Sequence, residues 1–228
     1  MSLPAFVQAL DQSLPTLRAS LRGPAAPGDL QALPPLLGTP LPPGVQDLYA
    51  TVDGQDPQRP GVLFGLTWLS ARQAAQEHAT WMDLAADDTS LLSEPAGAIR
   101  AGTFHPAWLP LATDGSGNGL ATDLAPGETG AAGQVITYGP DETTRRVVSP
   151  NVQAFFGWAA QAVTRGDLRL DGDVVTYRGQ GRSWTPCGPC RCPCRDRGPP
   201  GSPAPYTQAL LISQLTICWR YAVPFAPP

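Results

Sequence analysis

"HPAWLPLATDGSGNGLATDLAPG", residues 105–127, is the stretch that decides the fold of this chain. Its polar centre, Asp114-Gly-Ser-Gly-Asn-Gly119, lies between two apolar runs at 107–113 and 119–125. Glycine supplies the positive φ angles of tight turns, and the side chains of Asp114 and Asn118 can hydrogen-bond to a turn backbone. The pattern therefore predicts a β-hairpin whose strands are the two apolar runs.

The same centre has some features of a metal or phosphate loop. Asp114, Ser116 and Asn118 stand at the first, third and fifth positions of a calcium loop, and Gly119 stands at the sixth. The twelfth position, where such a loop needs a bidentate Glu, is Ala125. The glycine spacing fits neither a dinucleotide-binding nor a Walker motif, and the chain contains no lysine. We therefore expect neither a metal nor a cofactor at this site.

Residues 1–179, which we call the body, show a regular alternation of apolar runs and turn residues in their second half. Four short apolar runs follow one another at 107–113, 119–125, 133–139 and 145–148. They predict an antiparallel meander. Ser149 followed by Pro150 predicts the start of a helix, and residues 168–179 have a hairpin pattern around Asp171-Gly172.

The first third of the chain is predicted to be helical. Apolar residues between Leu3 and Leu21 recur at helical spacing, and Pro15 either kinks this helix or divides it in two, with Ser13 as the second cap. Further helices are expected at 29–37 and 43–52.

A first strand and a longer helix are predicted next. The apolar run at 61–66 indicates the strand. Ser70 and Gln73 have capping-box spacing, which predicts a helix over 70–84 with His78 and Trp81 on its apolar face. The polar segment 85–104, interrupted by glycine and proline, is expected to be a loop with exposed acidic residues.

The charge distribution is uneven along the chain. Residues 1–179 carry 18 acidic residues and 10 arginines, a net charge of −8, whereas residues 180–228 carry one acid and five arginines, a net charge of +4. An acidic body disfavours nucleic acid as the main ligand and suits a basic protein partner. No apolar run approaches the ~18 residues of a membrane helix and the N-terminus shows no leader pattern, so we expect a cytoplasmic protein with no membrane partner.

Residues 180–228 differ in composition from the body. All five cysteines of the chain lie there, four of them in "CGPCRCPC" at 187–194. A single C-x-x-C pair is half of a zinc site, and no second ligand pair follows it. We expect this Pro/Cys-rich tail to be disordered or translated out of the ancestral frame.

A catalytic constellation is not apparent in the body. The body offers Ser and Thr hydroxyls but only two histidines, His78 and His105, and Ser116 lacks the G-x-S-x-G frame because Asp114 takes the first place. His78 is predicted to be a structural residue on a helix face, and His105 to mark the entry to a strand. We therefore expect no catalytic residues and no enzymatic activity.

Several stretches resemble the SUKH superfamily, which comprises fungal cell-wall-assembly regulators (Smi/Knr-like domains) and their bacterial relatives. The resemblance is carried, in order, by "LPPGVQDLYATVDGQ" (41–55), "GVLFGLTWLS" (61–70), "WLPLATDGSGNGLATDLAPG" (108–127) and "GQVITYGPDETTRRVVSPNVQAFFGWAAQAV" (133–163). The "WLPLATDGSGN" segment is the most specific of them. Asp53-Gly54 departs from the family's usual Asn-Gly, and nothing in the tail matches.

The resemblance implies an α+β domain in which helices wrap a central, mostly antiparallel sheet. It divides the chain into an N-terminal helical segment (1–40), a SUKH-like domain (41–179) and the tail (180–228). It also implies a non-enzymatic protein-binding module. The first hypothesis is an immunity protein that neutralises a nuclease-like bacterial toxin by direct contact; the alternative is a regulatory scaffold of cell-wall or signalling type without a toxin. A metal-dependent enzyme using the Cys-rich tail ranks last.

The partner-binding surface is predicted from charge and aromatic content. A basic toxin domain would meet an acidic surface faster because opposite potentials steer association. The residues expected to form this surface are Trp68, Trp81, Asp83, Asp87, Asp88, Asp114, Ser116 and Asn118.

Overall fold

The computed structural model describes residues 3–85, 91–141 and 143–177. The predicted tail at 180–228 and the predicted contact residues Asp87 and Asp88 lie outside these residues. The helices are α1 (Leu3–Ser13), α2 (Pro15–Arg18), α3 (Pro27–Leu37), α4 (Pro43–Thr51), α5 (Ala71–Leu84) and α6 (Val152–Thr164). The strands are β1 (Thr67–Trp68), β2 (Leu92–Glu94), β3 (Trp108–Thr113), β4 (Gly119–Asp123), β5 (Gln134–Tyr138), β6 (Thr144–Ser149), β7 (Leu168–Asp171) and β8 (Val174–Tyr177).

Six of the strands form one sheet in the order β1-β3-β4-β5-β6-β2. Every pair in it is antiparallel except β2 with β6 at one edge, which is parallel. The predicted meander is the run β3-β4-β5-β6, and β7 and β8 form the predicted separate hairpin, with Gly172 at positive φ. The predicted α+β class with a mostly antiparallel sheet is confirmed.

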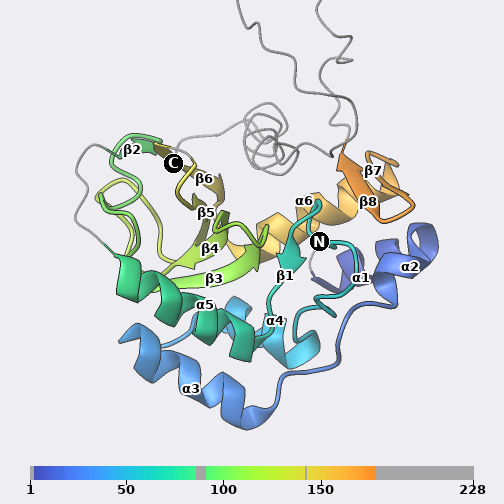
Figure 1. The fold of residues 1–228 in the computed structure, drawn as a ribbon, viewed down its shortest axis with the longest axis horizontal. Helices are drawn as coiled ribbons and strands as arrows, with labels where there is room; N and C mark the ends of the chain where they lie inside the picture. Colours follow the sequence, from blue (N-terminus) through green and yellow to red (C-terminus); the bar gives the residue numbers. More distant parts are fainter. Residues whose placement is uncertain (1–2, 86–90, 142, 178–228) are drawn as a thin grey trace, which may run out of the picture.

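Helices cover both faces of the sheet, which is why β4 and β5 are buried along their whole length. Leu111, Leu120 and Val135 join the core that α6 closes, whereas Trp108 and Ile136 join a second core under α5. Side chains alternate between the faces of a strand, so one apolar run supplies both cores. In Figure 1, α5 and α6 run on either side of the central strands.

The N-terminal helices pack onto the same core. α1 buries Phe6 and Leu10 and lies along α6, where the Phe6 and Phe156 rings are 5.4 Å apart between centroids. Pro15 divides the first helical stretch in two, but the residue that precedes α2 is Leu14, and Ser13 does not cap it. The predicted helices at 29–37 and 43–52 correspond to α3 and α4.

The starts of α5 and α6 depend on capping side chains. The predicted cap Ser70 is confirmed, and the predicted cap Ser149 is wrong. The Ser70 hydroxyl accepts from the N–H of Gln73 (3.2 Å) and the Gln73 side chain accepts from the N–H of Ser70 (3.0 Å), which confirms the capping box of α5. The cap of α6 is Asn151, whose side chain accepts from the N–H of Ala154 (2.8 Å). Ser149 is still part of β6 and bonds to the Asn151 carbonyl instead.

Two further predictions of secondary structure are wrong. The run 61–66 is no strand of the sheet but a tight buried loop, and the edge strand β1 begins only at Thr67. A buried apolar loop imitates a strand in composition, and here Phe64 adopts a positive φ of 59° that breaks the extended backbone. The segment 85–104 contains β2, a three-residue edge strand whose residues show no apolar alternation and are not fully buried.

None of the helices in the described part of the chain combines the length and apolar character needed to cross a membrane.

Candidate functional site

The turn between β3 and β4 is a rigid structure built around one carboxylate. Asp114 Oδ1 accepts from the backbone N–H groups of Ser116 (2.7 Å) and Asn118 (3.0 Å). Its Oδ2 accepts from the Ser116 hydroxyl (2.8 Å) and the Asn118 side-chain amide (2.9 Å). Gly115 and Gly117 supply positive φ angles, and the N–H of Asp114 bonds to the Asn118 carbonyl at 2.9 Å. The predicted hairpin is confirmed.

Asn118 connects this turn to the turn between β5 and β6. It is 4% exposed, its side-chain amide also donates to Asp141 Oδ2 (2.7 Å), and its Oδ1 accepts from the N–H of Asp141 (3.3 Å). Gly139 permits this approach, since an added Cβ there would lie 2.3 Å from Asn118 Oδ1. One buried amide therefore holds the carboxylates of Asp114 and Asp141 next to each other at the same end of the sheet.

An aromatic cluster under α5 supports the two turns. Trp81 is 8% exposed, stacks on Phe104 with centroids 5.8 Å apart, and lies beneath Gly117. The Trp81 indole N–H and the Tyr138 hydroxyl both donate to Glu77 Oε1 at 3.2 Å. Burial and the adjacent Glu77 raise the pKa of Tyr138 well above its usual value, so the phenol stays protonated and keeps donating.

The contacts described above hold Asp114 and Ser116 of the β3–β4 turn and Asp141 of the β5–β6 turn together. Asp83 and Leu84 end α5 two and three residues after Trp81, which lies beneath Gly117. We call these five residues the acidic rim. Asp83, Ser116 and Asp141 are exposed, and Leu84 is a large apolar side chain that is 63% exposed. The rim offers carboxylates with an exposed aliphatic side chain beside Asp83.

The structure brings together some of the predicted contact residues and separates one. Asp114, Ser116 and Asn118 are joined by hydrogen bonds in the β3–β4 turn, Trp81 lies beneath Gly117, and Asp83 is exposed two residues after Trp81. Trp68 is fully buried, packed on Phe156 at 4.8 Å between centroids, so its prediction as a contact residue is corrected: it belongs to the core. Asp141 was missed, because its proximity to Asn118 depends on the pairing of β4 with β5.

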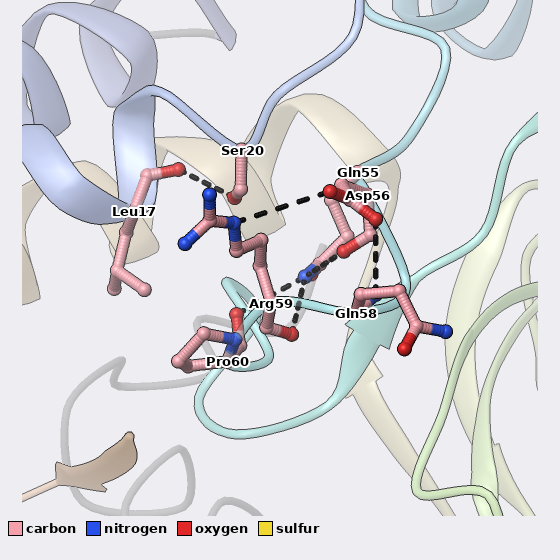
Figure 2. A network of polar contacts seen from close by, with 7 residues as sticks. All are labelled: Leu17, Ser20, Gln55, Asp56, Gln58, Arg59 and Pro60. Atoms are coloured by element: carbon pink, nitrogen blue, oxygen red, sulfur yellow. Dashed lines mark hydrogen bonds and ion pairs between the residues drawn. The ribbon is translucent and has the colours of Figure 1, made fainter. Parts of the chain in front are cut away.

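A second polar centre that sequence reasoning missed is Gln55, which is fully buried (Figure 2). Its Oε1 accepts from the N–H groups of Val62 (2.8 Å) and Trp68 (3.0 Å). Its Nε2 donates to the carbonyls of Pro60 (3.0 Å), Asp56 and Arg59 (both 3.3 Å). Gln55 thus provides the hydrogen bonds that the irregular loop at 56–66 does not make with other strands.

The titratable groups near β3 serve structural roles. His78 is 2% exposed and its Nε2 bonds to the Pro106 carbonyl (2.7 Å), as expected of a structural histidine. His105 Nδ1 accepts from the N–H of Ala107 (3.1 Å) just before β3. Asp123 is fully buried, accepts from Ala125 and Gln134, and has a pKa raised by burial. In the part of the chain that the structure describes, the hydrogen bonds of both histidines go to backbone groups, those of Pro106 and Ala107.

Replacing Asn118 by Asp is expected to destabilise the protein by about 2 kcal/mol or more at pH 7, because a third carboxylate would face those of Asp114 and Asp141. Asn118→Ala should cost less, since water can hydrate the freed carboxylates. Urea unfolding of both variants measures the difference. Equal losses for the two variants would show that Asn118 does not hold the carboxylates together.

Calcium is expected to leave the melting temperature of the wild-type protein unchanged. Both oxygens of Asp114 already accept from N–H and O–H groups, and the Asn118 amide presents its donor, not its oxygen, to the carboxylates. Differential scanning fluorimetry with and without calcium checks this, with magnesium as the control. A calcium-specific rise would contradict this geometry.

The stability of the protein is expected to fall as the pH drops through 6.5. Partial burial and the neighbouring Arg100 lower the pKa of His105 below its usual value of 6.5. The unfolded chain therefore takes up this proton first, and the stabilisation present above pH 6.5 is lost between 6.5 and the lower folded-state pKa. His105→Asn, which keeps an acceptor for Ala107, should weaken this dependence when unfolding is measured at several pH values. An unchanged dependence would assign it to other groups.

The comparison with protein families gives one match over most of the body. The family model described as SMI1 / KNR4 family (SUKH-1) matches residues 24–158, more than half of the chain.

Curated fungal proteins are also similar to this chain. A Schizosaccharomyces pombe protein named "Cell wall biosynthesis/cell cycle regulator smi1" is 34% identical over 170 residues, which cover 68% of this chain and 34% of that protein. The Neurospora crassa "Glucan synthesis regulatory protein" is 42% identical over 82 residues (36% of this chain, 15% of that protein). The Saccharomyces cerevisiae "Cell wall assembly regulator SMI1" is 39% identical over 85 residues (37% and 17%). The chain spans about a third or less of the length of these relatives.

Proposed function

Because the chain belongs to the SMI1/KNR4 family (SUKH-1), we propose that it is a non-enzymatic regulatory module that binds a basic segment of a partner protein through the acidic rim. The observation that carries this proposal is the fixed placement of Asp114 and Asp141 by the buried amide of Asn118.

Preorganisation makes the acidic rim suited to binding. An exposed side chain that must be ordered on binding reduces affinity. The Asp114 carboxylate, held by four hydrogen bonds, contributes a fixed negative charge, and Asn118 also holds the exposed Asp141 by one carboxylate oxygen. Leu84 adds an apolar contact that a purely electrostatic surface lacks. An arginine-rich segment with an apolar side chain would match both features.

The relatives favour the regulatory alternative over the immunity hypothesis. The fungal relatives described above are named as regulators of cell wall biosynthesis, glucan synthesis and cell wall assembly, and none of these three names refers to a toxin. We therefore propose a regulatory scaffold of cell-wall or signalling type as the function of this chain. Neutralisation of a nuclease-like toxin finds no support in these names, and a cytoplasmic location stays a prediction of the sequence.

Site-specific cross-linking tests the proposal. A photoreactive amino acid is placed at Ser116, which is exposed on the acidic rim, and a matched one at Asp173, which is exposed in the β7–β8 turn. After irradiation in an extract of the source cells, a protein with a basic segment should be cross-linked from position 116 and not from position 173. Cross-links of the same proteins from both positions, or none from position 116, would overturn the proposal.

A further inference from the structure

A groove with more basic than acidic residues lies among the N-terminal helices. It has a volume of about 590 Å³ and is lined by α1, by the end of α2 with the segment that follows it, and by the end of α4. Val7, Leu21 and Val52 are its partly or fully buried apolar lining. Arg18, Arg22 and Asp11 are its charged residues, so the groove is locally basic on an acidic protein.

The walls of this groove are held by backbone hydrogen bonds. The N–H of Arg22 donates to the Gly54 carbonyl (3.0 Å), and the N–H of Asp53 donates to the Gly23 carbonyl (2.8 Å). The wall on the other side is α1, which is packed along α6. The groove is therefore formed before any ligand arrives, and its volume lies in the range of ligand-binding clefts, roughly 300 to 1,000 Å³.

The two arginines of the groove differ from the other described arginines. Arg72, Arg146 and Arg165 form ion pairs with acids. Arg100, Arg145 and Arg169 bond to backbone carbonyls, and Arg59 lies near Asp56. Among the described residues, no ion pair or side-chain hydrogen bond is found for the guanidinium groups of Arg18 and Arg22. A guanidinium stays charged at any physiological pH and pairs well with carboxylates.

We propose that this groove binds an acidic peptide segment that carries an aliphatic side chain between carboxylates. The aliphatic side chain would lie on Val7, Leu21 and Val52, and the flanking carboxylates would pair with Arg18 and Arg22. The net negative charge of the body disfavours acidic ligands elsewhere on the surface. Arg18 and Arg22 therefore direct an acidic peptide to the groove. Asp11, the single acid of the groove, repels such a ligand, so removing its charge should strengthen binding, whereas removing the charge of either arginine should weaken it.

This site is independent of the acidic rim. It uses different helices and takes a ligand of opposite charge, so either site can exist without the other. Most of its side chains, from Val7 to Arg22, precede residue 24, where the family match begins. The groove therefore lies mainly outside the region on which the regulatory proposal rests.

Fluorescence anisotropy with a labelled Asp-Glu-Leu-Leu-Glu-Asp peptide tests the proposal on the full chain. We expect saturable binding that Arg18→Gln and Arg22→Gln each weaken by about fivefold, that the double variant weakens further, and that Asp11→Asn strengthens by a few fold. Arg169→Gln, which changes the net charge equally outside the groove, should have no effect, and an Arg-Lys-Leu-Leu-Lys-Arg peptide should leave the amide NMR signals of residues 7, 21–23 and 52 unchanged. Amide NMR shifts caused by the acidic peptide should cluster at residues 7, 21–23 and 52.

Four results would overturn the proposal. The first is the absence of saturable binding by the wild-type protein, and the second is a loss of peptide affinity in Arg169→Gln equal to that in the groove variants. The third is complete displacement of the labelled peptide by inorganic phosphate at an ordinary buffer concentration. The fourth is a set of NMR shifts that lies away from the groove. Circular dichroism of each variant separates a loss of binding from a loss of folding. None of these results depends on the acidic rim, so they leave the regulatory proposal untouched.

Discussion

Gln55→Met is expected to lower the free energy of unfolding by about 3 to 5 kcal/mol while changing the side-chain volume little. The substitution leaves the buried N–H groups of Val62 and Trp68 without their acceptor, and it leaves the carbonyl of Pro60 without its donor. Each unsatisfied buried group costs about 1 to 3 kcal/mol, and the loop at 56–66 cannot replace these partners by pairing with a strand. Urea unfolding at pH 7 measures the loss.

Gln55→Glu provides the matched control for this prediction. Its carboxylate keeps an acceptor for Val62 and Trp68 but places an oxygen where Nε2 donated to three carbonyls. The variant should therefore be unstable at pH 7 and recover partly at lower pH, because the folded state takes up a proton before the unfolded chain does. A loss below about 1 kcal/mol for Gln55→Met would show that water replaces the amide and that Gln55 does not organise the loop.

Gly54→Ala is expected to cost about 3 kcal/mol or more, for two separate reasons. Gly54 has φ of +67°, which is unfavourable for a residue with a Cβ. An added Cβ would also lie 2.5 Å from the Ser70 nitrogen and 2.7 Å from the Trp68 oxygen, both backbone atoms that cannot move without shifting β1.

Gly38→Ala separates these two reasons. Gly38 ends α3 with nearly the same φ, +66°, but an added Cβ there has nothing within 4 Å. The Gly38 variant should lose only about 1 kcal/mol, from the backbone conformation alone. Thermal unfolding of the two variants gives the comparison, and equal losses would contradict the close approach of Gly54 to the backbone between Trp68 and Ser70.

The parts of the fold that the sequence predicted correctly are those set by local chemistry. Asp114, Asn118 and the glycines between them determine the β3–β4 turn within five residues, and Ser70 with Gln73 determines the start of α5 within four. Helical spacing located α1 for the same reason. These signals depend on neighbours in the chain, so they can be recognised without the tertiary structure.

The parts that were predicted wrongly depend on contacts between distant residues. The apolar run 61–66 has the composition of a strand, but Gln55 and the positive φ of Phe64 make it a loop. β2 exists because it pairs with β6, about fifty residues later, and nothing in its own three residues indicates a strand. Ser149 looked like a cap because Pro150 follows it, yet the sheet extends to Ser149 and Asn151 caps α6.

The same distinction applies to the candidate site. Asp83, Asp114 and Ser116 were predicted from charge and turn chemistry and lie at the surface or in the surface turn. Trp68 was predicted as a contact because large aromatic residues often form binding surfaces, but it fills the core against Phe156. Asp141 could be added only when the pairing of β4 with β5 placed it beside Asn118.

The most direct test of the central claim is the affinity of the cross-linked partner for charge-reversed variants of the full chain. Asp83→Arg changes an exposed residue of the acidic rim, and Asp173→Arg makes the same change in the separate β7–β8 hairpin. Isothermal titration calorimetry at low salt should show binding weakened tenfold or more by Asp83→Arg and by less than twofold by Asp173→Arg. Equal effects of the two substitutions, or an unchanged affinity in Asp83→Arg, would contradict the assignment of partner binding to the acidic rim.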